Sequence, residues 1–274
     1  MIRLAVWAPV DAAEAVLAAL LELAPSGVEQ VDGDGWVEYA VYGAPGELPA
    51  LAGGDAEVAG VRVRVTGEEV ASDWAERWKR FHVPVLIGGR LWVRPPWEEP
   101  AVGPDAIDLV IDPGRAFGTG AHATTRLCLE LLLDLDLKGR SLCDLGCGSG
   151  VLSIAAAKLG AEPVVALDSD RLAVQATQGN ARDNGVLLEE VRRANLREEP
   201  CPPADVVVAN LMRPLLLRVA ELMAEPPRAL IVSGLLEHEA DEVARAFSPL
   251  SERHRVVSRG WAAVGLNGPL PLDR

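Results

Sequence analysis

The sequence lacks long apolar runs, closely paired cysteines and clustered histidines. No apolar stretch approaches the roughly 18 to 20 residues that cross a bilayer, so we expect no membrane span. The four cysteines show no CxxC spacing and the four histidines are scattered, which predicts neither a metal site nor a disulfide framework. Thiols of this kind are typical of small core residues in the reducing cytoplasm, where we expect this protein to act.

Basic side chains are also scarce, above all near the amino terminus. The chain has 26 Lys and Arg against 40 Asp and Glu, for a net charge of −14, and residues 1–70 hold only three of the basic residues. An acidic surface repels phosphate backbones, so we expect no direct binding of nucleic acid and favour a basic protein partner. Solubility, or adaptation to salt, explains the same acidic excess equally well.

The chain of 274 residues, 49% of them hydrophobic, is long enough for one large domain or two smaller ones. Over residues 1–68, apolar alternation and turn residues predict the order β-α-β-β-α-β, which is typical of a small α+β ferredoxin-like domain. The expected strands are residues 2–7, 28–31, 36–41 and 61–65, and the expected helices are about 11–23 and 45–51.

Tryptophan and proline are concentrated in residues 69–104, which hold four of the seven tryptophans. Because prolines interrupt regular structure, we expect a linker here, with Trp rings that pack on one domain or the other. A hinge that also touches the substrate is the alternative. Within this stretch we expect only a short helix over 73–81 and a short strand over 90–93.

From residue 105 to residue 274 the pattern changes to alternating strands and helices. That alternation predicts an α/β domain with a seven-stranded, Rossmann-like sheet, parallel except for a terminal hairpin across Arg259 and Gly260. The expected strands are residues 141–144, 163–167, 188–192, 205–209, 229–233, 253–258 and 261–266.

A glycine-rich loop, Asp144–Gly150, lies between the first of these strands and the next helix. Its G-x-G-x-G spacing, with Val151 after it, departs from the G-x-G-x-x-G of dinucleotide-binding loops. The carboxylate of Asp144 would repel a pyrophosphate but could accept hydrogen bonds from an ammonium group. Asp168, at the end of the next strand, could accept hydrogen bonds from both ribose hydroxyls of an adenosine.

These features describe a nucleoside bound without phosphates, with an amino-acid tail near the loop. That description fits S-adenosyl-L-methionine, which Gly146 and Gly148 would let approach the backbone closely. A tight strand-to-helix turn in another kind of α/β enzyme is the alternative. S-adenosyl-L-methionine is therefore the expected cofactor.

Asn210 ends the fourth strand of this sheet, where open α/β sheets bind their ligands. Its side-chain oxygen could accept a hydrogen bond from an amine and aim the nitrogen lone pair at a methyl group. A helix cap is the simpler alternative. Upstream, the glycines and hydroxyls of Asp112–Thr125 favour a lid over the cofactor, with His122 either structural or a catalytic helper.

Three segments resemble the PrmA family of bacterial ribosomal-protein methyltransferases: Asp112–Thr125, Asp144–Gly150 and residues 206–211. The resemblance covers about residues 70–266, and its most specific part is the run at residues 117–125. By this resemblance the cofactor contacts would be Thr125, Gly146, Asp168 and Asn210, with Gly118 and Thr119 closing the methionine end.

The resemblance also implies the activity and the partner. Members of the family trimethylate amino groups of a ribosomal protein at the stalk base of the large subunit, on lysine side chains or the N-terminal amine. They grip it with a small N-terminal domain that a flexible linker joins to the methyltransferase domain. We expect a monomer with this activity. The alternatives are methylation of another protein and a non-catalytic cofactor-binding module.

Overall fold

The chain folds into two compact units, Met1–Phe81 and His82–Arg274. The computed structural model describes residues 2–23, 28–33, 35–43, 48, 53–69, 82–100, 103, 106–113 and 122–268. Within these residues no helix is long and apolar enough to cross a membrane.

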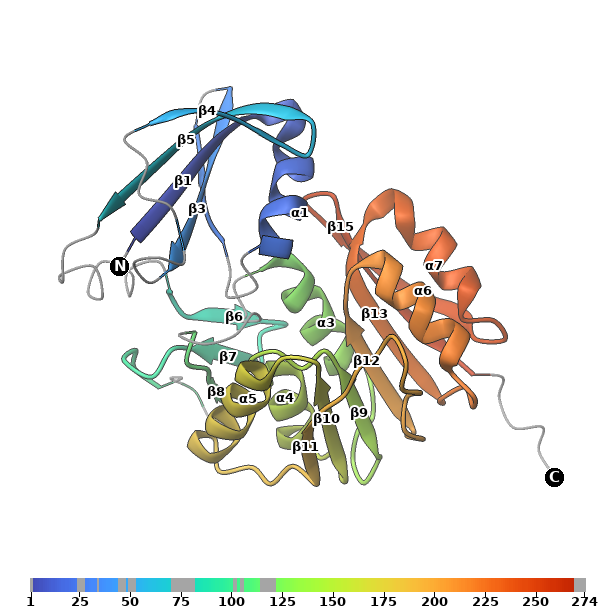
Figure 1. The fold of residues 1–274 in the computed structure, drawn as a ribbon. Coiled ribbons are helices and arrows are strands. Elements are labelled where there is room, and N and C mark those ends of the chain that lie inside the picture. Colours follow the sequence, from blue (N-terminus) through green and yellow to red (C-terminus); the bar gives the residue numbers. More distant parts are fainter. Residues whose placement is uncertain are drawn as a thin grey trace. The chain divides into compact units, whose positions relative to one another are not determined.

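The first unit is an antiparallel sheet with the strand order β2-β3-β1-β5-β4, and helix α1 packs on one of its faces (Figure 1). The predicted strands and the first predicted helix are confirmed, whereas the second predicted helix lies outside the described residues. The elements are β1 Ile2–Pro9, α1 Ala13–Leu23, β2 Glu29–Asp32, β3 Trp36–Gly43, β4 Gly54–Val58 and β5 Val61–Glu69.

The core of this unit follows from the alternation along the strands. Val6 of β1, Tyr39 of β3 and Val63 of β5 are buried against Val16 and Leu20 of α1. Strand β4 was not predicted, because four of its five residues are exposed and carry no apolar pattern. It is held by pairing with β5 as the second half of a hairpin.

The second unit begins with a three-stranded sheet of order β6-β7-β8, formed by Val85–Ile87, Leu91–Arg94 and Ile107–Val110. Leu91 and Val93 alternate with half-buried residues and join the hydrophobic core of this unit. Residues 82–100 are therefore part of the second unit, although their Trp and Pro content led us to expect a linker over 69–104. The predicted helix at 73–81 lies outside the described residues.

A seven-stranded sheet of order β11-β10-β9-β12-β13-β15-β14 forms the rest of this unit, and it confirms the predicted Rossmann-like architecture. Only β15 runs in the direction opposite to the other six strands. The predicted hairpin is confirmed, with left-handed φ values of 51° at Arg259 and 80° at Gly260. The strands are β9 Leu142–Leu145, β10 Val164–Asp168, β11 Glu190–Arg193, β12 Val206–Asn210, β13 Ala229–Leu236, β14 Ser251–Ser258 and β15 Trp261–Asn267.

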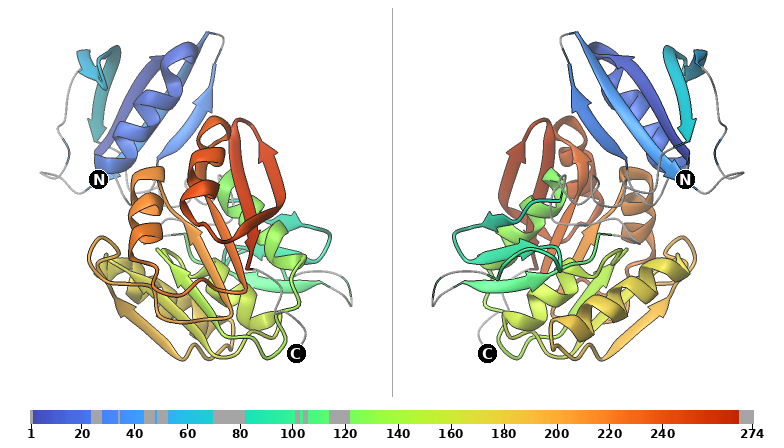
Figure 2. Two further views of the ribbon diagram at one scale, coloured as in Figure 1. Left: turned by 90° about the vertical axis from the view of Figure 1, so that its right-hand side faces the viewer. Right: turned by 90° about the vertical axis from the view of Figure 1, so that its left-hand side faces the viewer.

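Helices cover both faces of this sheet (Figures 1 and 2), which explains its almost continuous apolar strands. Along β12, Val206 and Val208 pack into one core with α3 and α4, and Val207 and Ala209 pack into the other core with α6 and α7. The helices are α3 Ala123–Leu133, α4 Val151–Lys158, α5 Arg171–Asp183, α6 Arg213–Leu222 and α7 Ala240–Ala246.

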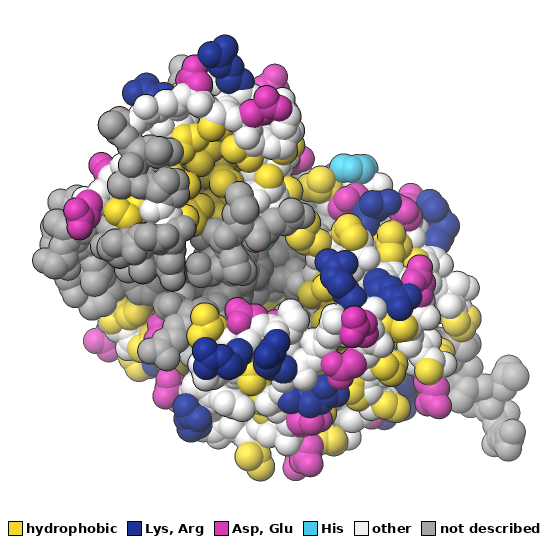
Figure 3. Space-filling view, viewed as in Figure 1, with side chains coloured by type: hydrophobic (Ala, Val, Ile, Leu, Met, Phe, Trp, Pro, Cys, Tyr) yellow, Lys and Arg dark blue, Asp and Glu magenta, His cyan; other side chains and the backbone are white. Residues whose placement is uncertain are grey.

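Charged side chains of both signs lie side by side on the described surface of the second unit (Figure 3). Arg213 pairs with Glu242 at 2.6 Å, and Arg255 pairs with Asp241 at 2.6 Å. The most buried ion pair among the described residues of this unit joins two strands of the small sheet, where Arg94 donates to both carboxylate oxygens of Asp108 at 2.8 and 2.7 Å.

We expect Asp108→Asn to lower the free energy of unfolding by about 1.5–3 kcal/mol, because the nearly buried guanidinium of Arg94 loses its charged partner. The matched control is Glu221→Gln, which removes the exposed pair with Arg218 and should change stability by less than about 0.5 kcal/mol. Urea unfolding of the two variants measures both effects, and equal losses would contradict the prediction.

Candidate functional site

The glycine-rich loop leaves the sheet at the end of β9 and leads directly into α4. Gly146, Gly148 and Gly150 have φ values of 77°, 54° and 81°, a region that residues with a Cβ rarely adopt. A Cβ on Gly146 would lie 2.3 Å from the side chain of Leu211. One on Gly150 would lie 2.8 Å from Thr177. The loop therefore needs glycine for both its backbone conformation and its close packing.

Asp168, at the end of β10, lies against this loop. Its Oδ2 accepts a hydrogen bond from the backbone N–H of Gly148 at 2.9 Å, and its Oδ1 accepts one from the N–H of Asp170 at 2.9 Å. An ionised carboxylate has about four acceptor positions, so both oxygens can accept one more hydrogen bond each. The structure thus brings Asp168 and Gly148 together, in an arrangement that suits two ribose hydroxyls.

Asp144 lies at the base of the loop and is fully buried. Its Oδ2 accepts hydrogen bonds from the backbone N–H and the hydroxyl of Ser153, at 3.1 and 2.5 Å. Its Oδ1 has no hydrogen-bond partner among the described residues. A buried polar atom left in this way costs free energy, so it marks a position where a ligand donor or a water would bind favourably.

Burial raises the pKa of Asp144 to about 6, against the lowering effect of the two hydrogen bonds from Ser153. The negative charge of Asp168 raises it further. A positive group placed between these two carboxylates would relieve both effects. Perturbed carboxylate pKa values of this kind are common at functional sites.

Asn210, at the end of β12, points toward α3. Its amide nitrogen donates a long hydrogen bond, 3.4 Å, to the hydroxyl of Thr125, which is only 1% exposed. This contact brings together two of the predicted site residues, and it orients the amide so that Asn210 Oδ1 is the atom left for another donor. The helix-cap alternative for Asn210 is not realised, since α6 begins only at Arg213, with Met212 as its N-cap.

The backbone after Asn210 depends on a glycine in the neighbouring strand. Gly234 of β13 has a φ of 82°, and a Cβ at this position would lie 2.4 Å from the carbonyl oxygen of Leu211. The strand pairing of β13 with β15 is interrupted at this point. Gly234 therefore allows the chain to leave β12 close to the sheet, and the sequence analysis did not single it out.

His122 caps α3. Its Nδ1 accepts a hydrogen bond from the backbone N–H of Thr124 at 3.3 Å. Its ring packs edge-on against the ring of Trp261, with 5.2 Å between the ring centroids. Burial, and secondarily the charge of Arg126, lowers the pKa of His122. The geometry gives His122 a structural role, and its role as a catalytic helper stays a prediction. Gly118 and Thr119 lie outside the described residues.

Two side chains that hold the site were also missed from the sequence. Ser153 of α4 fixes Asp144, and Thr177 of α5 donates to the carbonyl oxygen of Gly148 at 3.1 Å. Both are fully buried. A polar residue on the buried side of an otherwise apolar helix is the signal that could have found them.

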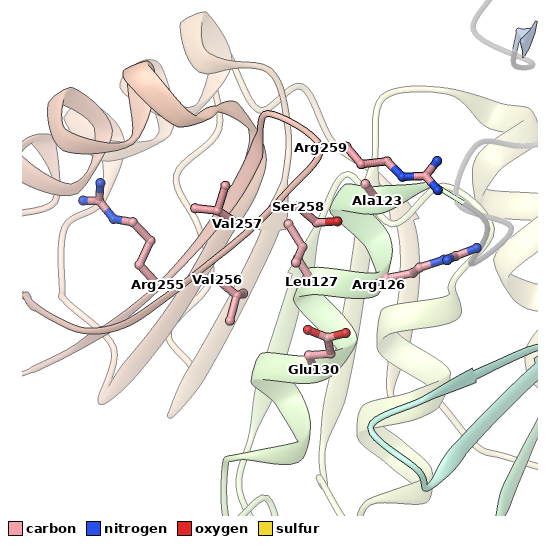
Figure 4. A pocket seen from close by; sticks show the side chains of 9 residues that line it. All are labelled: Ala123, Arg126, Leu127, Glu130, Arg255, Val256, Val257, Ser258 and Arg259. Carbon is pink, nitrogen blue, oxygen red and sulfur yellow. The ribbon is translucent and has the colours of Figure 1, made fainter. Parts of the chain in front are cut away.

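A pocket of about 590 Å³ lies elsewhere in the second unit, between α3 and β14 (Figure 4). None of the predicted site residues lines it, and Thr125 on the same helix contacts β12 instead. The candidate site is therefore the edge formed by the ends of β9, β10 and β12. The pocket is lined by Ala123, Arg126, Leu127, Glu130, Arg255, Val256, Val257, Ser258 and Arg259.

Most of the chain also matches a known protein family. Residues 51–267 match the family model described as ribosomal protein L11 methyltransferase (PrmA). The chain belongs to this family. The three segments that resembled PrmA in the sequence all lie within the matched residues.

Individual proteins of the PrmA family are also similar to this chain in sequence. The chain is 43% identical over 191 residues to a ribosomal protein L11 methyltransferase of Pectobacterium atrosepticum, and 44% identical over 198 residues to one of Photobacterium profundum. These alignments cover 66% and 70% of this chain, but they span only 64% and 66% of the length of those relatives.

A solved PrmA structure is similar as well. The crystal structure of ribosomal protein L11 methylase from Lactobacillus delbrueckii subsp. bulgaricus superposes with a TM-score of 0.61 and 26% identity, covering 68% of this chain and 98% of that one. The fold predicted from the sequence is thus the fold of a PrmA relative.

Asp144→Asn tests the electrostatics of the site. Because the native pKa of about 6 lies above the ordinary value of 3.8, the wild-type protein is stabilised fully below about pH 4 and loses that stabilisation as the pH rises to about 6. The variant has no such titration. We expect its unfolding free energy, relative to wild type, to rise by about 2–3 kcal/mol between pH 4 and pH 7.

Urea unfolding at several pH values measures this difference. The difference in unfolding free energy between the two proteins at pH 4 is the internal control. It already includes any effect of the buried amide that does not depend on pH. Parallel pH profiles for the two proteins would contradict the assigned environment of Asp144.

Proposed function

We propose that this protein transfers methyl groups from S-adenosyl-L-methionine to amino groups of ribosomal protein L11, on lysine side chains or the N-terminal amine. Membership of the PrmA family supports this proposal, and so does the name that its relatives carry. The observation that carries it is the buried, unpartnered Oδ1 of Asp144 beside the glycine-rich loop. Acting on a ribosomal protein would place the enzyme in the cytoplasm.

The residues of the site fit this methyl donor. The unpartnered Oδ1 of Asp144 would accept a hydrogen bond from the ammonium group of its amino-acid tail. Asp168 would take the two ribose hydroxyls, since each of its oxygens has accepted only one backbone hydrogen bond. Gly146 and Gly148, without side chains, would let the donor lie against the backbone.

When bound, the donor supplies a methyl group on a positively charged sulfur. An amine nitrogen would bond to the methyl carbon in line with the carbon–sulfur bond, which breaks and releases S-adenosylhomocysteine. Asn210 Oδ1 would accept a hydrogen bond from that amine and point its lone pair toward the methyl carbon. A lysine with a pKa near 10.4 is almost fully protonated at neutral pH, so it must first lose a proton, which desolvation in the site favours. Water takes up that proton.

The direct test uses the purified full chain, methyl-labelled S-adenosyl-L-methionine, and L11 either free or in assembled ribosomal subunits. We expect label on L11 and on no other ribosomal component. Label on another protein or on RNA would show that the enzyme transfers methyl groups but that L11 is not its substrate. Donor binding without any transfer would instead make the chain a non-catalytic cofactor-binding module.

Two substitutions separate positioning of the amine from binding of the donor. Asn210→Ala should lower turnover much more than donor affinity, because its oxygen would accept a hydrogen bond from the amine. Asp168→Ala should weaken donor binding by about 1–3 kcal/mol, because a charged hydrogen-bond acceptor is lost. Calorimetry with S-adenosylhomocysteine and initial rates of transfer measure the two effects. Equal loss of affinity and turnover in Asn210→Ala would refute its assigned role.

A further inference from the structure

Asn180 of α5 joins two segments that are far apart in the sequence. Its amide nitrogen donates to the carbonyl oxygen of Ser149 in the glycine-rich loop at 2.8 Å, and its Oδ1 accepts from the backbone N–H of Asp112 at 3.0 Å. The side chain is 3% exposed, so neither hydrogen bond competes with solvent.

The glycine-rich loop depends on such support. A glycine on either side of Ser149 has a positive φ, and glycine backbones are the least restricted of all residues. Helix α5 holds two successive carbonyl groups of the loop, that of Gly148 through Thr177 and that of Ser149 through Asn180. Because a peptide unit is planar and trans, fixing the Ser149 carbonyl also fixes the N–H of Gly150, which donates to Cys147 O at 2.7 Å.

The C-cap of the same helix is also an asparagine and provides a comparison. Asn184, one turn later, accepts from the N–H of Val110 at 2.9 Å and donates to its carbonyl oxygen at 2.6 Å. Asn184 therefore holds the last residue of β8, and Asn180 holds the chain two residues later. Only Asn180 also reaches the glycine-rich loop.

We propose that Asn180 is a positioning residue of the methyl-donor site, which sets the conformation of the glycine-rich loop and ties the segment at Asp112 to it. This inference rests on the proposed function for the identity of the ligand. Without the bond to Ser149, the loop samples conformations that do not fit the donor, and the apparent affinity falls with the fraction of competent loop.

The test compares Asn180→Asp with Asn184→Asp. Each variant keeps the oxygen that accepts from the backbone N–H, removes the N–H donor, and adds one negative charge to the same helix. Only Asn180→Asp removes the hydrogen bond to the loop. Asn180→Ala and Asn184→Ala form a second, uncharged pair, in case the buried charge prevents folding.

Three measurements are made on each protein: the Kd for S-adenosylhomocysteine, the thermal midpoint, and hydrogen exchange of residues 146–151 in the ligand-free state. We expect Asn180→Asp to raise the Kd roughly five- to hundredfold, the range for losing one partner of a buried carbonyl, and to speed exchange in the loop. Asn184→Asp should lower the thermal midpoint and leave both the Kd and the loop exchange as in the wild type.

Equal changes in the Kd for both asparagines, or no change for either, would overturn the proposal and leave Asn180 a purely structural residue. A wild-type protein that does not bind S-adenosylhomocysteine would overturn the proposed function. In that case the exchange comparison still decides the role of Asn180, because faster loop exchange in Asn180→Asp alone supports it and equal exchange refutes it.

Discussion

The parallel pairing of β9 with β10 on one side and β12 on the other is the constraint on which the candidate site depends. Leu145 at the end of β9 lies opposite Leu167 in β10 and opposite Ala209 in β12. The next residue of each strand or loop, which includes Asp168 and Asn210, therefore reaches the same edge of the sheet. The helices that follow β9 and β12 must turn away from this point, and the resulting crevice is where open α/β sheets bind ligands.

This site is maintained against a cost in stability. The carboxylate of Asp144 is fully buried, and only one of its oxygens accepts hydrogen bonds, both from Ser153. Its burial raises its pKa. An amide or a hydrophobic residue would be cheaper to bury at neutral pH. A ligand that brings a positive donor to Oδ1 recovers part of this free energy on binding, so the same feature that destabilises the empty protein strengthens the complex.

The sequence predicted the parts of this structure that local patterns encode. The central strands of the large sheet follow from apolar runs, and the loop follows from glycines that require positive φ values. Strand β4 was missed because its exposed residues carry no apolar alternation. His122 was not expected as a cap, since histidine is not among the usual N-cap residues.

The contacts that hold the site were missed for a different reason. Asn180 and Ser149 are 31 residues apart, and Asn210 and Thr125 are 85 residues apart. Nothing in a single sequence pairs such positions, because the pairing arises only when the helices pack on the sheet. The sequence therefore indicated which side chains lie at the strand ends, but not which contacts hold them there.

The supporting contacts share one side of the sheet. Thr125 of α3 holds Asn210, Ser153 of α4 holds Asp144, and α5 holds the glycine-rich loop. The strand residues involved have the same parity as Leu142 and Val208, which pack into the core formed with α3 and α4. Helices α6 and α7 belong to the other core.

The two hydrophobic cores of the second unit therefore have different roles. The core with α3 and α4 contains the hydroxyl and amide groups that fix the site, so its packing determines both stability and the geometry of the strand ends. The core with α6 and α7 supports the opposite face of the sheet through apolar contacts. Since packed cores shift between discrete arrangements and do not deform continuously, a repacking beneath α3 would displace Asn210, whereas a repacking beneath α7 would be felt there only through the strands.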